Sequence, residues 1–324
     1  MARGLPGAVL LAAAALALAG CAAHGPVLSP VVEERYEPRV ELEATPFYPQ
    51  EQYQCGPAAL AMVLSAAGVA VTPEQLVPAI YLPGRRGSLQ PELLAATRQH
   101  DRIPYVLPGS TDALVATLAG GLPVLVLQKL GAGPVPGWHY AVVVGYDSPR
   151  DRVVLRSGTE RRREMKASHF LATWERAGRW AMVALEPGVL PPGADLGRYM
   201  EAAAGLEAVG RLDAAAPAYA AAVDHWPTEP LPQLALANLA YARGDLAAAE
   251  RGYHAVARLD PSSAAARNNR AEVLGQLGCG ATARREIELA RALAGDGPLA
   301  ATVAATARKI ATLPDRDVAG CPTD

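Results

Sequence analysis

Hydrophobic residues follow two different patterns in the two halves of the chain. Between residues 123 and 185 they form short runs rich in β-branched residues, and from residue 196 onward they recur between turn residues with helical spacing. Short β-rich runs bounded by turn residues are typical of strands. We therefore expect strands at residues 104–107, 123–128, 139–146, 152–156 and 180–185.

Helical segments precede most of these strands. Residues 58–64 are apolar on every side, which predicts a buried helix rather than an amphipathic one. Pro57 suits the first turn of this helix and Gly68 its end. Helices followed by an antiparallel sheet are typical of an α+β domain. The expected helices cover residues 58–67, 72–80, 91–100 and 111–119.

The second half repeats with a period of 34 residues. Gly210, Gly244 and Gly278 are spaced by 34, and so are Tyr219 and Tyr253. This period predicts stacked helix-turn-helix units, and the segments Gly244-Asp245-Leu246 and Leu259-Asp260-Pro261 resemble tetratricopeptide repeats. We expect an all-α solenoid with a capping helix over 298–313. Such a solenoid either binds a peptide in its concave groove or serves as a rigid spacer.

The first 20 residues predict a lipoprotein signal peptide. The apolar run over residues 8–19 is too short for a membrane span, which needs about 20 residues. The segment Leu18-Ala19-Gly20-Cys21 resembles a bacterial lipobox, in which Cys21 is diacylated and becomes the mature N-terminus. An ordinary secretory signal cleaved nearby is the alternative. Ala22 favours the outer membrane, so we expect a lipid-anchored protein facing the periplasm.

Proline-rich segments divide the chain. Pro26, Pro30 and Pro38 with scattered charges predict a tether, and the Pro/Gly-rich segment after residue 187 predicts a linker. The expected organisation is a signal peptide (1–20), a tether (21–44), a first domain (45–187), a linker (188–195), a repeat domain (196–313) and a tail (314–324).

Composition and charge exclude several classes of function. The 324 residues are 51% hydrophobic and carry a net charge of −2, which argues against a nucleic-acid partner. Apart from His139, the histidines are scattered without metal-ligand spacing, and no phosphate-binding glycine loop is present. We expect no metal or cofactor. The glycine-rich segment 131–137 either shapes a substrate cleft beside His139 or is a plain connector.

Cys55 and His139 are the residues that could carry chemistry together. Cys55 begins the buried helix, where free N–H groups and the helix dipole favour an anion and can lower a thiol pKa. His139 begins a predicted strand. A nucleophilic cysteine needs an imidazole partner that is its neighbour in the fold rather than in the sequence. The non-catalytic alternative is that Cys55 is a small buried residue and His139 a structural histidine.

A family resemblance supports the reactive interpretation. The segments Cys55-Gly56-Pro57-Ala58-Ala59-Leu60, Gly87-Ser88-Leu89, Gly121-Leu122-Pro123-Val124 and His139 to Tyr146 come in the order seen in bacteriocin-processing, double-glycine-leader cysteine peptidases. The resemblance implies a papain-like fold over residues 45–187. It also implies that Cys55 is the nucleophile, His139 the base and Gln50 the oxyanion donor. The family places this glutamine six residues before the cysteine, where Pro49 stands here.

The resemblance implies cleavage of a peptide or protein after small residues such as Gly-Gly. The repeats would then capture the substrate or a protein partner. Two alternatives stay open, namely another acyl transfer by the same thiol, such as amide hydrolysis or crosslinking, and a non-enzymatic adaptor that only binds peptides.

The residue that orients His139 follows from strand geometry. Asp147 lies about 26 Å further along one strand at about 3.3 Å per residue, which is too far. The turn near Pro149 returns residues 157–160 beside His139, so Ser157 fits best and Glu160 is the carboxylate alternative.

Two other groups of residues have alternative interpretations. We interpret Arg161-Arg162-Arg163 as a solvated turn, and the alternative is a docking site for an acidic partner. Cys279 and Cys321 either pair in an oxidising periplasm or remain free thiols.

Overall fold

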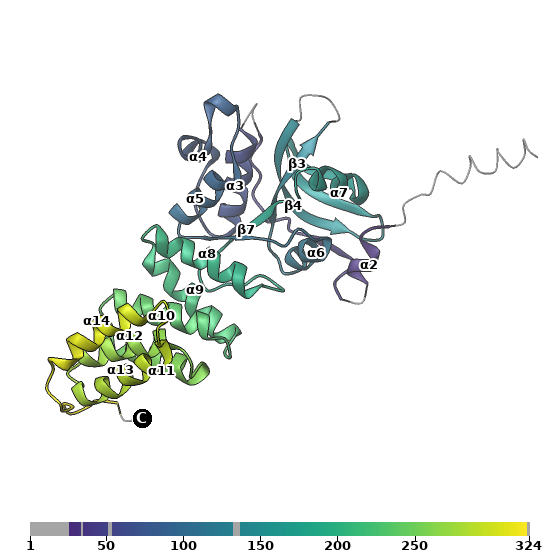
Figure 1. The fold of residues 1–324 in the computed structure, drawn as a ribbon. Helices are drawn as coiled ribbons and strands as arrows, with labels where there is room; N and C mark the ends of the chain where they lie inside the picture. The colour runs from purple at the N-terminus through teal and green to yellow at the C-terminus, as the bar shows by residue number, and fades with distance from the viewer. Residues whose placement is uncertain (1–25, 34, 51–53, 132–136, 323–324) are drawn as a thin grey trace, which may run out of the picture.

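The computed structural model describes residues 26–33, 35–50, 54–131 and 137–322 (Figure 1). In these residues one antiparallel sheet has the strand order β2-β7-β3-β4-β5-β6, and β1 pairs with the far end of β4. The strands are β1 (Arg39–Glu41), β2 (Ile103–Val106), β3 (Val124–Leu130), β4 (Gly137–Asp147), β5 (Arg152–Ser157), β6 (Glu160–Lys166) and β7 (Ala181–Leu185).

Helices cover both faces of the sheet because its central strands are apolar on both sides. Along β3, Leu125 and Leu127 pack into the core under the first helices, whereas Val124 and Val126 belong to the core on the opposite face. This alternation follows from the two-residue period of a strand. On the first face lie α3 (Cys55–Ala66), α4 (Pro73–Ile80) and α5 (Gln90–Gln99); the opposite core includes α6 (Thr111–Ala119), α7 (Ala167–Glu175) and α8 (Leu196–Ala208).

The all-apolar helix of the sequence is α3, and the prediction that it is buried is confirmed. Every residue from Gly56 to Leu64 is buried. The helix ends at Ala66 with Ala67 as its C-cap, and the chain turns at Gly68, whose φ of +79° is a left-handed conformation that glycine adopts at little cost. A helix buried on all sides gives a rigid base for Cys55, its first residue.

Two expectations about local structure are wrong, and one helix was not expected. The segment expected as a tether is packed over much of its length: α2 (Ser29–Val32) buries Leu28 and Val32, and β1 pairs with β4. Asp151 Oδ1 also accepts hydrogen bonds from the N–H groups of Val27 and Leu28. The three arginines expected in a turn lie on β6, an exposed edge strand. The helix α7 follows it directly and has no counterpart in our sequence interpretation.

The second half forms a stack of antiparallel helices, and the 34-residue repeat is confirmed. The first helices of the units start at residues 196, 230 and 264, and the second helices at 212, 246 and 280. Gly210, Gly244 and Gly278 end the turns with positive φ angles. The remaining helices are α9 (Leu212–His225), α10 (Pro230–Ala242), α11 (Leu246–Leu259), α12 (Ala264–Gln276), α13 (Gly280–Ala294) and α14 (Ala300–Ala311).

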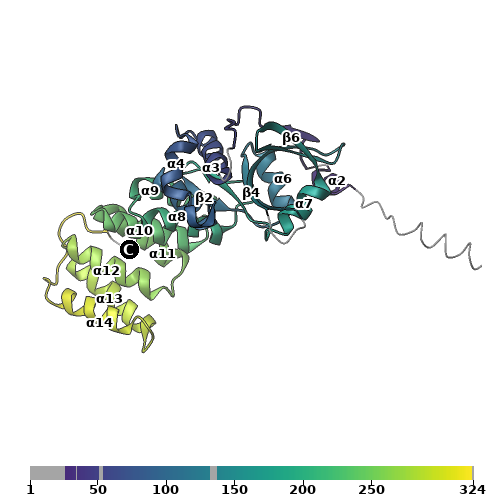
Figure 2. The ribbon, with the colours of Figure 1, turned by 90° about the horizontal axis from the view of Figure 1, so that it is seen from above.

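The two halves share a core instead of meeting at a free linker. Tyr199 and Leu206 of α8 are fully buried in the same hydrophobic cluster as Val183 of the sheet. The N–H of Asp195 donates to the Tyr105 hydroxyl on β2 at 3.0 Å. Both views show α8 beside the sheet domain and the later helices extending away from it (Figures 1 and 2). The first repeat is therefore part of the sheet domain's support.

The tail closes the free end of the solenoid. Cys279 and Cys321 form a disulfide with a Cα–Cα distance of 5.7 Å. Asp317 accepts hydrogen bonds from the N–H groups of Ala281 and Thr282 at the start of α13. The tail thereby caps that helix. Within the described part of the chain, no helix combines the length and the apolar character that crossing a bilayer requires.

Candidate active site

A cleft of about 880 Å³ brings together Cys55, His139 and Gln50, which are distant in the sequence. It lies where α3 begins and where β4 starts. The loop that follows α4 forms another wall of the cleft and contributes Arg85 and Ser88. The structure thus brings three of the candidate residues into one cavity.

Cys55 is the first residue of α3 and is the free cysteine among the described residues. Burial raises the pKa of its thiol, while the N–H groups of Tyr140, Gly56 and Cys55 itself act in the opposite direction. The expectation of a lowered thiol pKa at this helix start is therefore wrong. Desolvation of the thiolate outweighs the helix N-terminus, because the apolar surroundings of α3 exclude the water that would stabilise a charge.

His139 stands on β4 and is held by Ser157 on β5. The distance between His139 Nε2 and Ser157 Oγ is 2.8 Å, and Ser157 is buried. Burial first, and the charge of Arg163 second, lower the pKa of His139 to about 4. The imidazole is therefore neutral at pH 7. Because Ser157 occupies Nε2, the other ring nitrogen, Nδ1, is left for a partner in the cleft.

The two acidic alternatives lie elsewhere. Asp147 sits at the far end of β4, paired in register with Arg152, and its carboxylate lies 3.3 Å from Arg39 Nε. Glu160 is exposed and forms an ion pair with Arg163 at 3.3 Å. Neither carboxylate is bonded to His139. The register deduced from the turn near Pro149 therefore matches the structure, with Ser157 as the neighbour of the histidine.

Gln50 is fixed by three hydrogen bonds at the edge of the cleft. Its Nε2 donates to the Tyr140 carbonyl at 3.2 Å, and its Oε1 accepts from the Gly158 N–H at 2.9 Å. Its own N–H donates to the Gly158 carbonyl at 3.0 Å. The side chain therefore clamps the strand of His139 to the turn after Ser157. One hydrogen on Nε2 remains for another acceptor, since an amide nitrogen carries two.

The structure adds residues that our site prediction omitted. The Tyr140 hydroxyl donates to the Ser88 carbonyl at 3.3 Å, which joins β4 to the cleft loop. Gly56 allows this loop to approach, because a Cβ there would lie 2.5 Å from Ser88 Oγ. Trp138 is 53% exposed at the cleft, and Lys129 Nζ lies 5.5 Å from its ring centroid. Gly56, Trp138 and Tyr140 adjoin Cys55 or His139 in the sequence, and Ser88 belongs to the segment Gly87-Ser88-Leu89 on which the family resemblance partly rests.

Several sequence predictions concern residues outside the described ranges. The signal peptide, the lipidated Cys21 and most of the glycine-rich segment 131–137 fall there. In the part of the chain that the structure describes, no group of three histidine, cysteine or acidic side chains is arranged to hold a metal ion.

Comparison with known proteins identifies the first domain. Residues 42–182 match the Peptidase_C39 like family, a match that covers less than half of the 324 residues. The chain matches no curated protein. A protein from Bacillus anthracis described as a C39-like peptidase is 18% identical, with 45% of this chain and 97% of that chain covered and a TM-score of 0.39.

Other similar structures cover a little over a third of this chain. The type III secretion translocator chaperone SycD of Yersinia enterocolitica is 22% identical, with 36% of this chain and 83% of that chain covered and a TM-score of 0.34. PcrH, solved with the chaperone binding region of PopD, is 23% identical, with 37% of this chain and 95% of that chain covered and a TM-score of 0.35.

The family match and the element order define the fold class. The chain has an α+β papain-like, Peptidase C39-like domain followed by an all-α tetratricopeptide-repeat solenoid. The family match suggests a cysteine peptidase.

Proposed function

We propose that the chain is a cysteine peptidase in which Cys55 and His139 form the catalytic pair, Ser157 orients the histidine and Gln50 helps to bind the oxyanion. The observation that carries this proposal is the His139–Ser157 contact at the cleft that Cys55 also lines. In this proposal His139 Nε2–H donates to Ser157 Oγ, so the contact orients the ring and leaves Nδ1 as a proton acceptor. A histidine with only a structural role would not need a free nitrogen at this cleft.

The neutral pair defines the first chemical step. His139 Nδ1 accepts the thiol proton of Cys55 as Sγ attacks the carbonyl carbon of the scissile bond. The carbonyl π electrons move to oxygen. When they return, the C–N bond breaks, the imidazolium gives its proton to the leaving amine, and the acyl group stays on Sγ as a thioester. His139 then takes a proton from the water that attacks the thioester and returns it to the departing Sγ, which releases the carboxylic acid and the free thiol. The thiol and the imidazole thus exchange a proton during attack instead of resting as an ion pair.

The charge that develops on oxygen needs donors in place beforehand. The N–H of Cys55 belongs to the first turn of α3, where helix N–H groups have no partner inside the helix. The second Nε2 hydrogen of Gln50 is the other donor in this proposal. Removal of one oxyanion donor costs typically 10²–10³ in kcat. Gln50→Ala would also release Gly158, so Gln50→Glu, which keeps the acceptor, is the cleaner variant.

The resemblance and the repeats extend the proposal to substrate and location. Cleavage after small residues such as Gly-Gly is the family expectation, and the solenoid would capture the substrate or a protein partner. Lipidation at Cys21 would hold the chain on a bacterial membrane, in our proposal the outer membrane facing the periplasm. Mass spectrometry of the mature N-terminus tests the anchor, because an unmodified residue other than Cys21 would contradict it.

A peptidyl vinyl sulfone that ends in Gly-Gly tests the catalytic proposal. The native chain should form an adduct at Cys55, located by peptide mapping, and His139→Ala should slow adduct formation strongly. Cys55→Ser should form none at this position. A folded native chain that fails to react would favour the peptide-binding adaptor, and equal reaction in His139→Ala would contradict the base assigned here.

A further inference from the structure

The cleft that holds Cys55 and His139 is positively charged. Its lining includes Arg85 and Arg86 but no aspartate or glutamate among the described residues. His139 is neutral at pH 7 and adds no charge of its own. The apolar part of the lining comes from Leu89, Leu127 and Trp138. The described lining therefore holds no negative charge that would balance the two arginines.

Both arginines belong to a short loop that is closed by backbone hydrogen bonds. The Leu82 N–H donates to the Gly87 carbonyl at 2.8 Å, which joins the two ends of the loop. Between them lies a single 3₁₀ turn over Pro83–Arg85, in which the Arg85 N–H donates to the Leu82 carbonyl at 2.9 Å. The loop therefore carries its arginine side chains on a fixed backbone at the wall of the cleft.

The backbone of Arg86 has an unusual conformation for this residue type. Its φ is +48°, in the left-handed region that favours glycine and is costly for residues with a Cβ. Glycines stand nearby at positions 84 and 87, yet an arginine occupies the left-handed position. Residues held in such conformations cluster at active sites and ligand clamps. The loop geometry thus points to a role for its charged side chains in binding.

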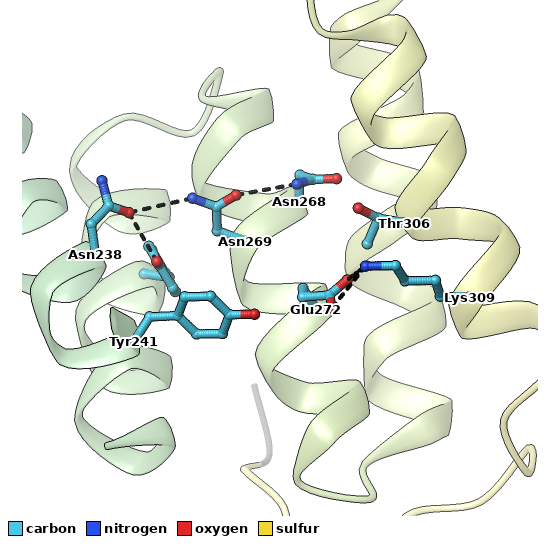
Figure 3. Close-up of a pocket in the computed structure, with 8 residues that line it drawn as sticks. Asn238, Tyr241, Asn268, Asn269, Glu272, Thr306 and Lys309 are labelled. Carbon is cyan, nitrogen blue, oxygen red and sulfur yellow. Dashed lines mark hydrogen bonds and ion pairs between the residues drawn. The ribbon is translucent and has the colours of Figure 1, made fainter. Parts of the chain in front are cut away.

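A hollow in the repeats provides a contrast, because the charge of its cation is matched within the chain. The hollow has a volume of about 360 Å³ and includes Lys309 in its lining. Figure 3 shows Lys309 beside Glu272, and the distance between Nζ and Oε1 is 3.2 Å. Arg85 is exposed at the cleft and takes part in no ion pair among the described residues. Its charge is therefore available to a ligand.

A carboxylate is the peptide group that suits Arg85 best. The guanidinium presents its N–H donors in a planar fork that matches the two oxygens of a carboxylate. Cys55 lines the same cleft, so a peptide held for attack by the thiol also passes the arginine loop. A volume of about 880 Å³ corresponds to a width of about 10 Å, which an extended chain covers with about three residues.

We propose that Arg85 selects peptide substrates that carry aspartate or glutamate within about three residues of the scissile bond. The proposal rests on the proposed function, because the selection acts on peptides that Cys55 cleaves. It adds the substrate class, an acidic peptide, and the residue that recognises it. The carboxylate of the substrate supplies the negative charge that the described lining of the cleft does not contain.

The test compares the sequences around cleaved bonds in a mixture of synthetic peptides, identified by mass spectrometry. With the native chain, aspartate and glutamate should be enriched about fivefold over asparagine and glutamine at one position near the cleaved bond, as expected of a partly exposed ion pair. Arg85→Gln should abolish this enrichment. The matched control is Arg258→Gln, which removes an exposed arginine of α11 in the repeats and should keep the enrichment.

A second measurement uses the native chain alone and does not depend on how a variant folds. Raising NaCl from about 0.05 M to about 0.5 M should reduce the enrichment, because salt screens exposed charges. Thermal unfolding of Arg85→Gln and Arg258→Gln shows whether each variant is folded. An enrichment that does not respond to salt would contradict recognition by charge.

Three further results would overturn the inference. They are cleavage without enrichment of acidic residues, an enrichment that folded Arg85→Gln retains, and an equal loss in Arg258→Gln, which would indicate a general effect of net charge. The same mixture incubated with Cys55→Ala reports on the proposed function. No cleavage by the native chain, or the same cleavage by Cys55→Ala, would remove the proposed function and this inference with it, whereas unselective cleavage through Cys55 would remove the inference alone.

Discussion

His139 Nε2 lies 2.8 Å from Ser157 Oγ, across the hairpin that joins β4 to β5. The position where a carboxylate would orient a catalytic histidine thus holds a neutral hydroxyl. A hydroxyl fixes the ring but stabilises an imidazolium less than a carboxylate does. This agrees with the lowered pKa of His139 and with a pair that rests uncharged.

Ser157→Ala should lower kcat/KM about tenfold, equivalent to about 1.4 kcal/mol of transition-state stabilisation. The ring would lose its orienting partner but keep its place in the strand. Asp147→Asn is the matched control, because Asp147 pairs with Arg39 at the far end of β4 and should leave kcat/KM unchanged. An inactive but folded Asp147→Asn would contradict the assignment of Ser157.

The rate of Cys55 alkylation by iodoacetamide should rise steadily from pH 6 to pH 9. The reason is that burial raises the thiol pKa, so the thiolate fraction is small at neutral pH and grows with pH. A resting ion pair would instead give a rate that is already maximal below pH 7. Peptide mapping assigns the label, and a plateau from pH 5 to pH 7 would disprove the neutral pair.

The free energy of unfolding should fall between pH 6.5 and pH 4, in part because of His139. Its folded-state pKa of about 4 lies below the ordinary value of 6.5. Between these two pH values His139 is protonated in the unfolded chain and largely neutral in the folded chain, so lowering the pH favours unfolding. The effect reaches about 3 kcal/mol and does not grow below pH 4. Urea unfolding of His139→Gln should show a correspondingly weaker pH dependence, and an identical slope in both proteins would refute this.

Gly56→Ala should lower kcat/KM several-fold while changing the melting temperature little. The new methyl group would lie 2.5 Å from Ser88 Oγ and push the cleft loop away from Cys55. Gly84→Ala on the same loop is the control, because no atom lies within 4 Å of its added Cβ. Adding Ser88→Gly should restore activity to Gly56→Ala, and failure of this rescue would locate the defect elsewhere.

Local patterns predicted most of the fold because they are strong in this chain. The apolar run after Cys55 predicted a buried helix. The glycines at 34-residue intervals predicted stacked helix pairs. The hairpin register likewise followed from strand rise and one turn. Predictions that needed tertiary information failed. Prolines indicated a tether, but burial of Leu28 and Val32 outweighed them.

In the candidate site, too, local patterns were predictive and properties that depend on tertiary structure were not. Sequence order and helix position identified Cys55 and His139 as partners for one cleft, and the register identified Ser157. The charge state of the thiol could not be predicted, because it depends on how completely α3 and its neighbours exclude water.

Cleavage of a peptide library followed by mass spectrometry tests the central claim most directly. The native chain and Cys55→Ala are incubated in parallel with a mixture of synthetic peptides, and the products are sequenced. We predict new termini with the native chain and none with folded Cys55→Ala. The same cleavages in both samples, or none with the native chain, would contradict a cysteine peptidase that acts through Cys55.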